Sequence, residues 1–249
     1  DQETSLGKQR LEMELFRTIE EIKMFAQVAI NEEWHCRSSQ KANFQESRPL
    51  LVKKNIPVGP VVVIGACNFP LAISVVGTDT ASALSVGCTV VVKAHPAHPR
   101  TCQILADLVK VAMEECEMPS GTFQLIHGES YEVTQSLVAH PSASCVAFTG
   151  SLQGGTVLSK IISQREKPIP FHAEMGSLNP VIALPHKVEN ETAKLALDYV
   201  QAVNLFAGQM CTKPGALFIL QSSDHLSFLQ CIKNTVNQQE ILPMLNGDI

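Results

Sequence analysis

The feature that most constrains this chain is the alternation of short apolar runs with longer helix-like stretches between residues 60 and 163. The run Pro60 to Gly65, PVVVIG, is apolar throughout and ends in glycine, which is typical of a strand buried on both faces. The small and apolar residues 70–86 that follow predict a helix. The unit then repeats as strands 89–93, 122–126 and 144–148, each followed by a helix, at 99–117, 131–139 and 151–163. This alternation predicts an α/β fold with a doubly wound parallel sheet, similar to the Rossmann arrangement.

Two stretches precede this region. Residues 8–30 predict an amphipathic helix that needs a partner surface, because apolar side chains recur at spacings of three and four. Residues 31–54 lose this period and predict an irregular segment. The apolar stripe of the helix consists of Leu11, Leu15, Ile19, Ile22, Phe25 and Val28.

The pattern changes after Lys167, where a second domain is expected to begin near Phe171. The apolar run NPVIAL precedes a predicted helix at 188–206, a strand at 216–220 and a helix at about 223–237. No closing strand is recognisable after that helix. We therefore expect a nucleotide-binding domain at 1–170, which includes the N-terminal helix, and part of a second, catalytic α/β domain at 171–249.

Charge and hydropathy exclude several classes of partner. The 19 basic and 24 acidic residues give a net charge of −5, which disfavours nucleic acid as a partner. No apolar run approaches the roughly 18 residues of a membrane span, and the polar start DQETSLGKQR does not resemble a signal peptide. These observations predict a cytoplasmic protein without membrane contact.

The cysteines and histidines do not form a metal-binding pattern. The eight cysteines are scattered without a C-x-x-C pair, so neither a zinc ribbon nor a disulfide framework is indicated. His95 and His98 form an H-x-x-H pair, but Pro96 and Pro99 interrupt the helix that would place both rings on one face. We therefore expect no metal site.

Three candidate binding residues or turns follow predicted strands, where ligands of parallel sheets are bound. Asn68 follows strand 60–65 and could donate to a ligand, although an Asn in this position, taken alone, more often turns the chain or caps the next helix. Lys93 ends the strand TVVVK and could meet a ribose or phosphate, or could simply be solvated. The turn GSLQGG, residues 150–155, offers backbone N–H groups and a helix N-terminus to a pyrophosphate, but glycine-rich turns are common.

Two further residues are of reactive types. Glu174 lies in HAEMGSLNP, where burial would raise its pKa and suit it to general-base catalysis. The alternative is an ordinary carboxylate at a strand end. Cys211 lies in GQMCT, in a turn where a thiol can be exposed, although most cysteines are buried packing residues.

In their order along the chain, five motifs resemble the aldehyde dehydrogenase superfamily between Ile56 and Leu220: PVGPVVVIGACNFPL, VVVKAHPAHP, FTGSLQGG, EMGSLNP and GQMCT. The sequences of these motifs are most similar to those of the branch that contains α-ketoglutarate semialdehyde (2,5-dioxovalerate) and fatty aldehyde dehydrogenases. This resemblance implies oxidation of a small aldehyde with NAD or NADP, and homo-oligomers in the full-length family.

The resemblance also implies residue roles. Cys211 is the nucleophile, Asn68 and the Cys211 N–H hold the oxyanion, and Glu174 activates water. The expected cofactor contacts are Ala66, Cys67, Lys93, Gly150, Ser151, Gly154 and Gly155. The loop HGESYE after strand 122–126 offers no arginine for the 2′-phosphate of NADP, for which His95, His98 or Arg100 could substitute.

Relatives are about twice this length, and the later motif E-E-x-F-G-P is absent from the sequence. A second hypothesis is therefore a non-catalytic nucleotide-binding fragment or pseudoenzyme. A third, an acyl-transfer enzyme that uses Cys211 alone, leaves the glycine turn and Lys93 without a purpose.

Overall fold

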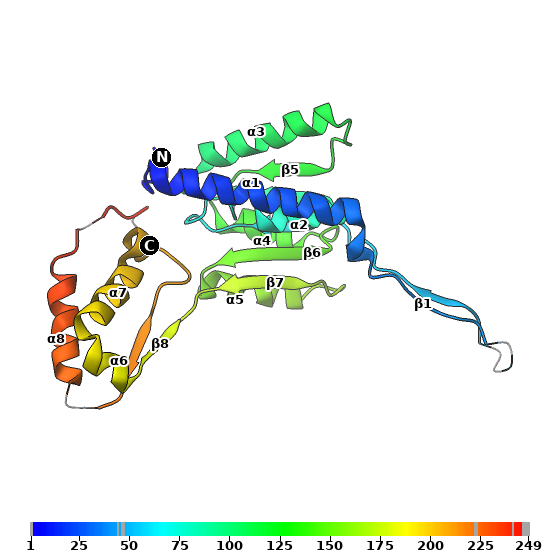
Figure 1. Cartoon of the computed structure of the whole chain (residues 1–249). Helices are drawn as coiled ribbons and strands as arrows, with labels where there is room; N and C mark the ends of the chain where they lie inside the picture. Colours follow the sequence, from blue (N-terminus) through cyan, green and yellow to red (C-terminus); the bar gives the residue numbers. More distant parts are fainter. Residues whose placement is uncertain (1, 44, 46–47, 222–223, 241, 246–249) are drawn as a thin grey trace. The chain divides into compact units, whose positions relative to one another are not determined.

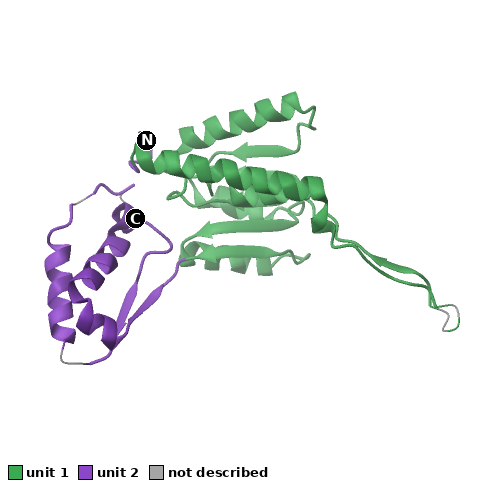
Figure 2. Cartoon of the chain, viewed as in Figure 1, with its two compact units in different colours: residues 1, 7–175 green, residues 2–6, 176–249 purple. Residues whose placement is uncertain are grey.

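The computed structural model describes residues 2–43, 45, 48–221, 224–240 and 242–245. The chain divides into two compact units (Figure 2). Unit 1 consists of residues 7–175, and unit 2 of residues 176–249 together with residues 2–6. No helix of the described residues has the length and apolar character that a membrane crossing requires.

Unit 1 is built on a parallel five-stranded sheet (Figure 1). Its strands are β3 (Val61–Ile64), β4 (Val90–Lys93), β5 (Phe123–Ile126), β6 (Cys145–Gly150) and β7 (Phe171–Met175). Their spatial order is β5-β4-β3-β6-β7, so the chain builds outward from β3 first in one direction and then in the other. The prediction of a doubly wound parallel sheet is confirmed.

Helices cover both faces of this sheet. Val61 and Val63 of β3 pack in one core with α2 (Thr78–Ser85) and α3 (Pro99–Glu115). Val62 and Ile64 pack in the other with α4 (Tyr131–Ala139) and α5 (Leu152–Ser163). All four β3 side chains are buried, which explains why the strand is apolar without alternation.

The long helix α1 (Lys8–Asn31) has α2 as a partner, as an amphipathic helix requires, but its fully buried residues are polar and do not belong to the predicted apolar stripe. Its buried residues are Arg10, Glu14 and Thr18. Leu15, Ile19 and Ile22 of the predicted stripe are at least 40% exposed. The reason is that α1 covers a loop whose backbone N–H groups need hydrogen-bond acceptors rather than apolar contacts.

The segment after α1 is more regular than predicted. A 3₁₀ turn, η1 (Glu33–His35), leads into strands β1 (Ser38–Gln40) and β2 (Leu51–Lys53), which pair antiparallel. This hairpin projects away from the sheet of unit 1 (Figure 1), and both its strands are exposed. A hydrophobic period is absent because neither face of the hairpin is buried.

The helix predicted at 70–86 begins only at Thr78, and turns occupy residues 67–77. Two of these turns are closed by the N–H groups of Ile73 and Ser74, which donate to the Phe69 carbonyl. Gly77 approaches the preceding turn so closely that a Cβ would lie 1.7 Å from the Ala72 carbonyl oxygen. The backbone thus folds back on itself here instead of continuing a helix.

Unit 2 is a smaller α/β unit. Strands β8 (Pro180–Ala183) and β9 (Ala216–Ile219) pair in parallel. Helices α7 (Thr192–Asn204) and α8 (His225–Val236) supply its core residues Ala196 and Phe228. The helix predicted at 188–206 is divided into α6 (Pro185–Asn190), α7 and a 3₁₀ turn, η3 (Leu205–Gly208). Residue 223, the first of the last predicted helix, lies outside the described residues.

The units meet in sequence after Met175, rather than at the predicted boundary of 170 and 171. The segment FHAEM forms β7, which pairs with β6 and completes the sheet of unit 1. The change of hydrophobic pattern that suggested the earlier boundary therefore marks the edge strand β7. Its alternation of half-buried and exposed residues differs from the buried strands before it.

Candidate active site

The reversal of strand order between β3 and β6 creates the topological switch point of the sheet. The two strands lie side by side, with Ile64 opposite Phe148. Ligands of doubly wound sheets bind in the crevice outside the strand carboxyl ends at such a point. The loop that carries Asn68 follows β3 and the glycine turn follows β6, so two segments predicted from sequence flank this position.

The loop that carries Asn68 is held by α1. One carboxylate oxygen of Glu14, Oε1, accepts hydrogen bonds from the backbone N–H groups of Leu71 and Ala72, each at 2.8 Å. The other, Oε2, lies 2.7 Å from Nη1 of Arg10, and both side chains are buried. Nη2 of Arg10 donates to the Asn68 carbonyl at 3.4 Å. A buried ion pair thus supports the backbone beside the carboxamide, a contribution that no sequence motif indicates.

Ala66 and Cys67 lie half-buried in this loop. Burial raises the pKa of the Cys67 thiol, which therefore stays protonated near neutral pH. Gly65 has no space for a side chain, because a Cβ would lie 2.5 Å from the Cα of Ser74. The loop is consequently compact, with Asn68 half-buried at its surface.

The glycine turn forms the start of α5 and fits a pyrophosphate. Ser151 caps the helix by accepting a hydrogen bond on Oγ from the Gly154 N–H at 3.1 Å. The first turn carries no acidic side chain, so its partial positive charge is not neutralised there. This free partial charge is the observation that makes these residues suitable for binding a dinucleotide.

The glycines of this turn are also required for packing. A Cβ on Gly155 would lie 2.3 Å from Sδ of Met175, and a Cβ on Gly150 would lie 2.6 Å from Cζ of Phe148. A Cβ on Gly154 would lie 3.2 Å from Oγ of Ser151. Because these glycines lack side chains, α5 can approach the sheet closely. One glycine of dinucleotide-binding turns has the same packing role.

Lys93, at the end of β4, is only 6% exposed, so it is not a solvated lysine. Its Nζ donates to the Gly128 carbonyl at 2.5 Å, which links the loops after β4 and β5. Burial lowers the pKa of this ammonium. Nearby, the rings of His95 and His98 stack with centroids 5.3 Å apart. Among the described residues, no group of three His, Cys, Asp or Glu side chains is placed to hold a metal ion.

Glu174 lies on β7 opposite Thr149, at the same end of the sheet as the glycine turn. Its side chain is exposed, so the expected burial is wrong for this chain. The alternation of the edge strand turns Glu174 away from the core formed by Phe171, Ala173 and Met175. Asp79, which belongs to none of the sequence motifs, has a pKa raised first by burial and then by the charge of Glu174.

Cys211 belongs to unit 2 and is exposed, as expected for its turn. Phe206 and Ala207, which precede the motif, and Gly208, its first residue, have left-handed φ of 51°, 58° and 73°. Oγ of Ser177 donates to the Cys211 carbonyl. Nδ2 of Asn179 donates to the same carbonyl at 2.6 Å and to the Lys213 carbonyl at 2.9 Å. The motif GSLNP therefore fixes the turn of the motif GQMCT.

The sheet of unit 1 brings most of the predicted site residues to the same end of its strands. Asn68, Lys93, the glycine turn and Glu174 all lie at or just beyond the carboxyl ends of its strands. Cys211 is carried by unit 2. The functional residues missed from sequence are the supporting ones, Arg10, Glu14, Ser177 and Asn179. Only the last two stood in a recognised motif.

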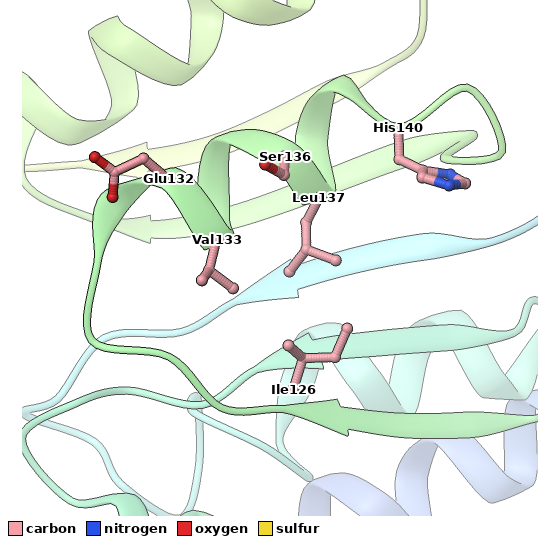
Figure 3. Close-up of a pocket in the computed structure, with 6 residues that line it drawn as sticks. All are labelled: Ile126, Glu132, Val133, Ser136, Leu137 and His140. Carbon is pink, nitrogen blue, oxygen red and sulfur yellow. The ribbon is translucent and has the colours of Figure 1, made fainter.

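A hollow of about 400 Å³ lies between α4 and β5 (Figure 3). The side chains of Val133 and Leu137, one helical turn apart, point toward Ile126 of β5 (Figure 3). The rest of its lining comes from Glu132, Ser136 and His140. None of the site residues predicted from sequence lines this hollow, so we assign it no role.

The strand order, the switch point and the acid-free glycine turn define a doubly wound α/β protein of the dinucleotide-binding type. The aldehyde dehydrogenase family pattern matches residues 3–246, and the chain belongs to this family. It is 40% identical over 225 residues to alpha-ketoglutaric semialdehyde dehydrogenase 2 of Azospirillum brasilense, covering 89% of this chain and 43% of that protein. It is 39% identical over 249 residues to alpha-ketoglutaric semialdehyde dehydrogenase of Acinetobacter baylyi, covering 98% and 47%.

A solved structure shows the same fold. The glyceraldehyde-3-phosphate dehydrogenase of Methanocaldococcus jannaschii, crystallised with NADP, aligns with a TM-score of 0.75 at 24% identity. The alignment covers 93% of this chain and 47% of that one. The chain thus spans about half the length of the relatives it matches. The family and branch indicated by the sequence motifs are confirmed.

Proposed function

We propose that this chain carries the cofactor-binding and nucleophile-bearing parts of an enzyme that oxidises a small aldehyde to the carboxylic acid with NAD or NADP. The aldehyde is α-ketoglutarate semialdehyde, in line with the names of the two relatives. The observation that carries the proposal is the exposed thiol of Cys211 in a turn whose carbonyl is held by Ser177 and Asn179. An accessible, pre-positioned thiol is what covalent catalysis requires.

In the proposed reaction, the Cys211 thiolate attacks the aldehyde carbon and forms a thiohemiacetal. The carboxamide of Asn68 and the Cys211 N–H donate to the oxyanion, and one such donor is worth about 3 to 4 kcal/mol. A bound nicotinamide supplies the acceptor for the hydride whose loss converts this adduct into a thioester. Glu174 then takes a proton from the water that releases the acid and regenerates the thiolate.

The dinucleotide is held by unit 1 in this proposal, and unit 2 presents the nucleophile. The N-terminus of α5, with Gly150, Ser151, Gly154 and Gly155, receives the pyrophosphate. Lys93 reaches the adenosine ribose, and Ala66 and Cys67 border the cofactor. This assignment is supported by the first turn of α5, which carries no acidic side chain and lies beside the switch point.

We also propose a cytoplasmic location and self-association of the full-length protein. The location is supported by the cysteines, all eight of which are free, as is usual in a reducing compartment. Self-association is carried over from the family resemblance alone.

The test is to incubate the purified chain with α-ketoglutarate semialdehyde and NAD or NADP, and to follow the absorbance of the reduced nicotinamide. Cys211→Ala is expected to abolish turnover while cofactor binding, measured by calorimetry, is retained. Cys116→Ala is the matched control, because Cys116 is also exposed but lies at the end of α3. Turnover that survives Cys211→Ala would remove Cys211 from the mechanism. Binding without any turnover would favour a nucleotide-binding fragment or pseudoenzyme.

A further inference from the structure

A second hollow, of about 140 Å³, opens at the carboxyl ends of β4 and β5. It is lined by the loops that follow these two strands and by the start of α3: Ala94, His95, Pro96, Pro99, His127, Gly128 and Glu129. β4 is the neighbour of β3 on one side of the switch point. In doubly wound dinucleotide-binding sheets, the ribose of the adenosine half is bound near the strand that follows the first. The hollow therefore lies where this ribose would bind.

The position of Glu129 at the hollow is fixed on both sides. On one side, the preceding residue, Gly128, accepts the hydrogen bond from Nζ of Lys93. A Cβ on Gly128 would lie 2.7 Å from Cγ2 of Val133, so the loop lies tightly against α4. On the other side, Ser130 is the N-cap residue of α4. The short loop therefore holds the exposed Glu129 at the lining of the hollow.

The charges around the hollow favour a hydroxyl over a phosphate. Glu129 supplies the one carboxylate among the lining residues. The pKa of His95 is lowered to about 4, by burial first and then by His98 and Lys93, so the ring is neutral at pH 7. His98, another sequence candidate for a 2′-phosphate, is fully buried and its Nδ1 lies 3.3 Å from Sγ of Cys102. Nε2 of His127 lies 2.8 Å from the Gln103 side-chain oxygen.

We propose that Glu129 selects NAD over NADP by accepting a hydrogen bond from the ribose 2′-hydroxyl and repelling a 2′-phosphate. This inference rests on the proposed function, because it assigns specificity within the same cofactor site. A phosphate monoester carries nearly two negative charges at neutral pH, so a carboxylate beside it is unfavourable. A hydroxyl in the same place can donate to the carboxylate.

The test measures binding rather than turnover. Adenosine 5′-monophosphate and adenosine 2′,5′-bisphosphate differ only at the 2′ position, and their dissociation constants are compared by isothermal titration calorimetry. The wild-type chain is expected to bind the monophosphate more tightly. Glu129→Gln should shift the ratio of the two constants by about tenfold toward the bisphosphate, as expected for one hydrogen bond to a charged group.

Glu132→Gln is the matched control, because Glu132 is an exposed carboxylate three residues further along that does not line this hollow. It should leave the ratio unchanged. A wild-type preference for the bisphosphate, with Arg100 of the first α3 turn as the candidate phosphate partner, would overturn the proposal. So would an unchanged ratio in Glu129→Gln. Both of those outcomes would leave dinucleotide binding intact, whereas a wild-type chain that binds neither nucleotide nor NAD would refute the proposed function as well.

Discussion

Asn179 donates a hydrogen bond from Nδ2 to the backbone carbonyl of Cys211, at 2.6 Å. The two residues are 32 positions apart in sequence, and the contact joins two motifs that resemble those of the family. Asn179 has φ of 46°, in the left-handed region where asparagine is tolerated better than most residues. Both its side chain and its backbone conformation therefore contribute to the Cys211 turn.

This relationship predicts different effects for two truncations at the same position. Asn179→Gly removes the side-chain donors but tolerates the positive φ, and we expect a loss of about 1 kcal/mol in the free energy of unfolding. Asn179→Ala removes the same donors and adds left-handed strain, with a further loss of about 1 kcal/mol. Urea unfolding followed by circular dichroism measures both. Equal stabilities of the two variants would contradict the role given to the backbone.

The buried pair of α1 predicts a large stability loss on neutralisation. Glu14→Gln leaves Arg10 without its carboxylate partner, and breaking a buried pair costs about 3 to 5 kcal/mol. Glu20→Gln on the same helix is the control, because the Glu20 and Lys23 side chains are at least 50% exposed. An exposed pair of this kind contributes less than about 1 kcal/mol. Similar urea midpoints for the two variants would show that Glu14 does not support the loop.

His95 predicts a stability loss in acid. Its pKa is lowered from 6.5 to about 4 in the folded chain, so the folded ring stays neutral where the unfolded ring takes up a proton. The contribution to stability is therefore fully present above pH 6.5 and is lost as the pH falls toward about 4. At about 1.4 kcal/mol per pKa unit, the loss approaches roughly 3 kcal/mol.

The measurement compares the free energy of unfolding of the wild type and His95→Asn across this pH range. In the wild type, Nδ1 of His95 accepts a hydrogen bond from the Ala97 N–H at 3.1 Å. The asparagine side chain retains an acceptor for this N–H. The variant should lose less stability in acid than the wild type. Parallel pH profiles would mean that His95 does not carry the effect.

The close approach of α5 to β7 predicts that Gly155 does not tolerate a methyl group. A Cβ would lie 2.3 Å from Sδ of Met175, which must move, and overpacking of this kind costs about 1 to 3 kcal/mol. Gly121→Ala is the control, since nothing lies within 4 Å of its added Cβ. Thermal unfolding of both variants checks the expectation. A Gly155→Ala chain as stable as Gly121→Ala would indicate that Met175 yields without cost.

The sheet could be predicted because its strands are encoded locally. Four consecutive buried residues make β3 apolar throughout, and the strands that follow repeat the pattern with helices between them. The candidate site residues at the strand ends followed from that order. The positions of Asn68, Lys93 and the glycine turn at one edge of the sheet needed no knowledge of tertiary contacts.

The supporting contacts could not be predicted because they join polar residues that are distant in sequence. Arg10 and Glu14 have the spacing of an ordinary helical ion pair, and nothing in their surroundings indicates a loop 57 or 58 residues later. The burial of Glu174 was predicted wrongly for a related reason. Its apolar neighbours along the chain suggested a core position, whereas the edge strand presents alternate residues to opposite faces.

The bonds from Glu14 to the backbone of Leu71 and Ala72 also determine how this part of the protein opens. Both N–H groups find their acceptor on a separate helix instead of in their own turn. They are therefore protected from hydrogen exchange only while α1 remains docked. Deuterium uptake at these two amides reports detachment of α1, and with it the moment at which the Asn68 loop loses its shape.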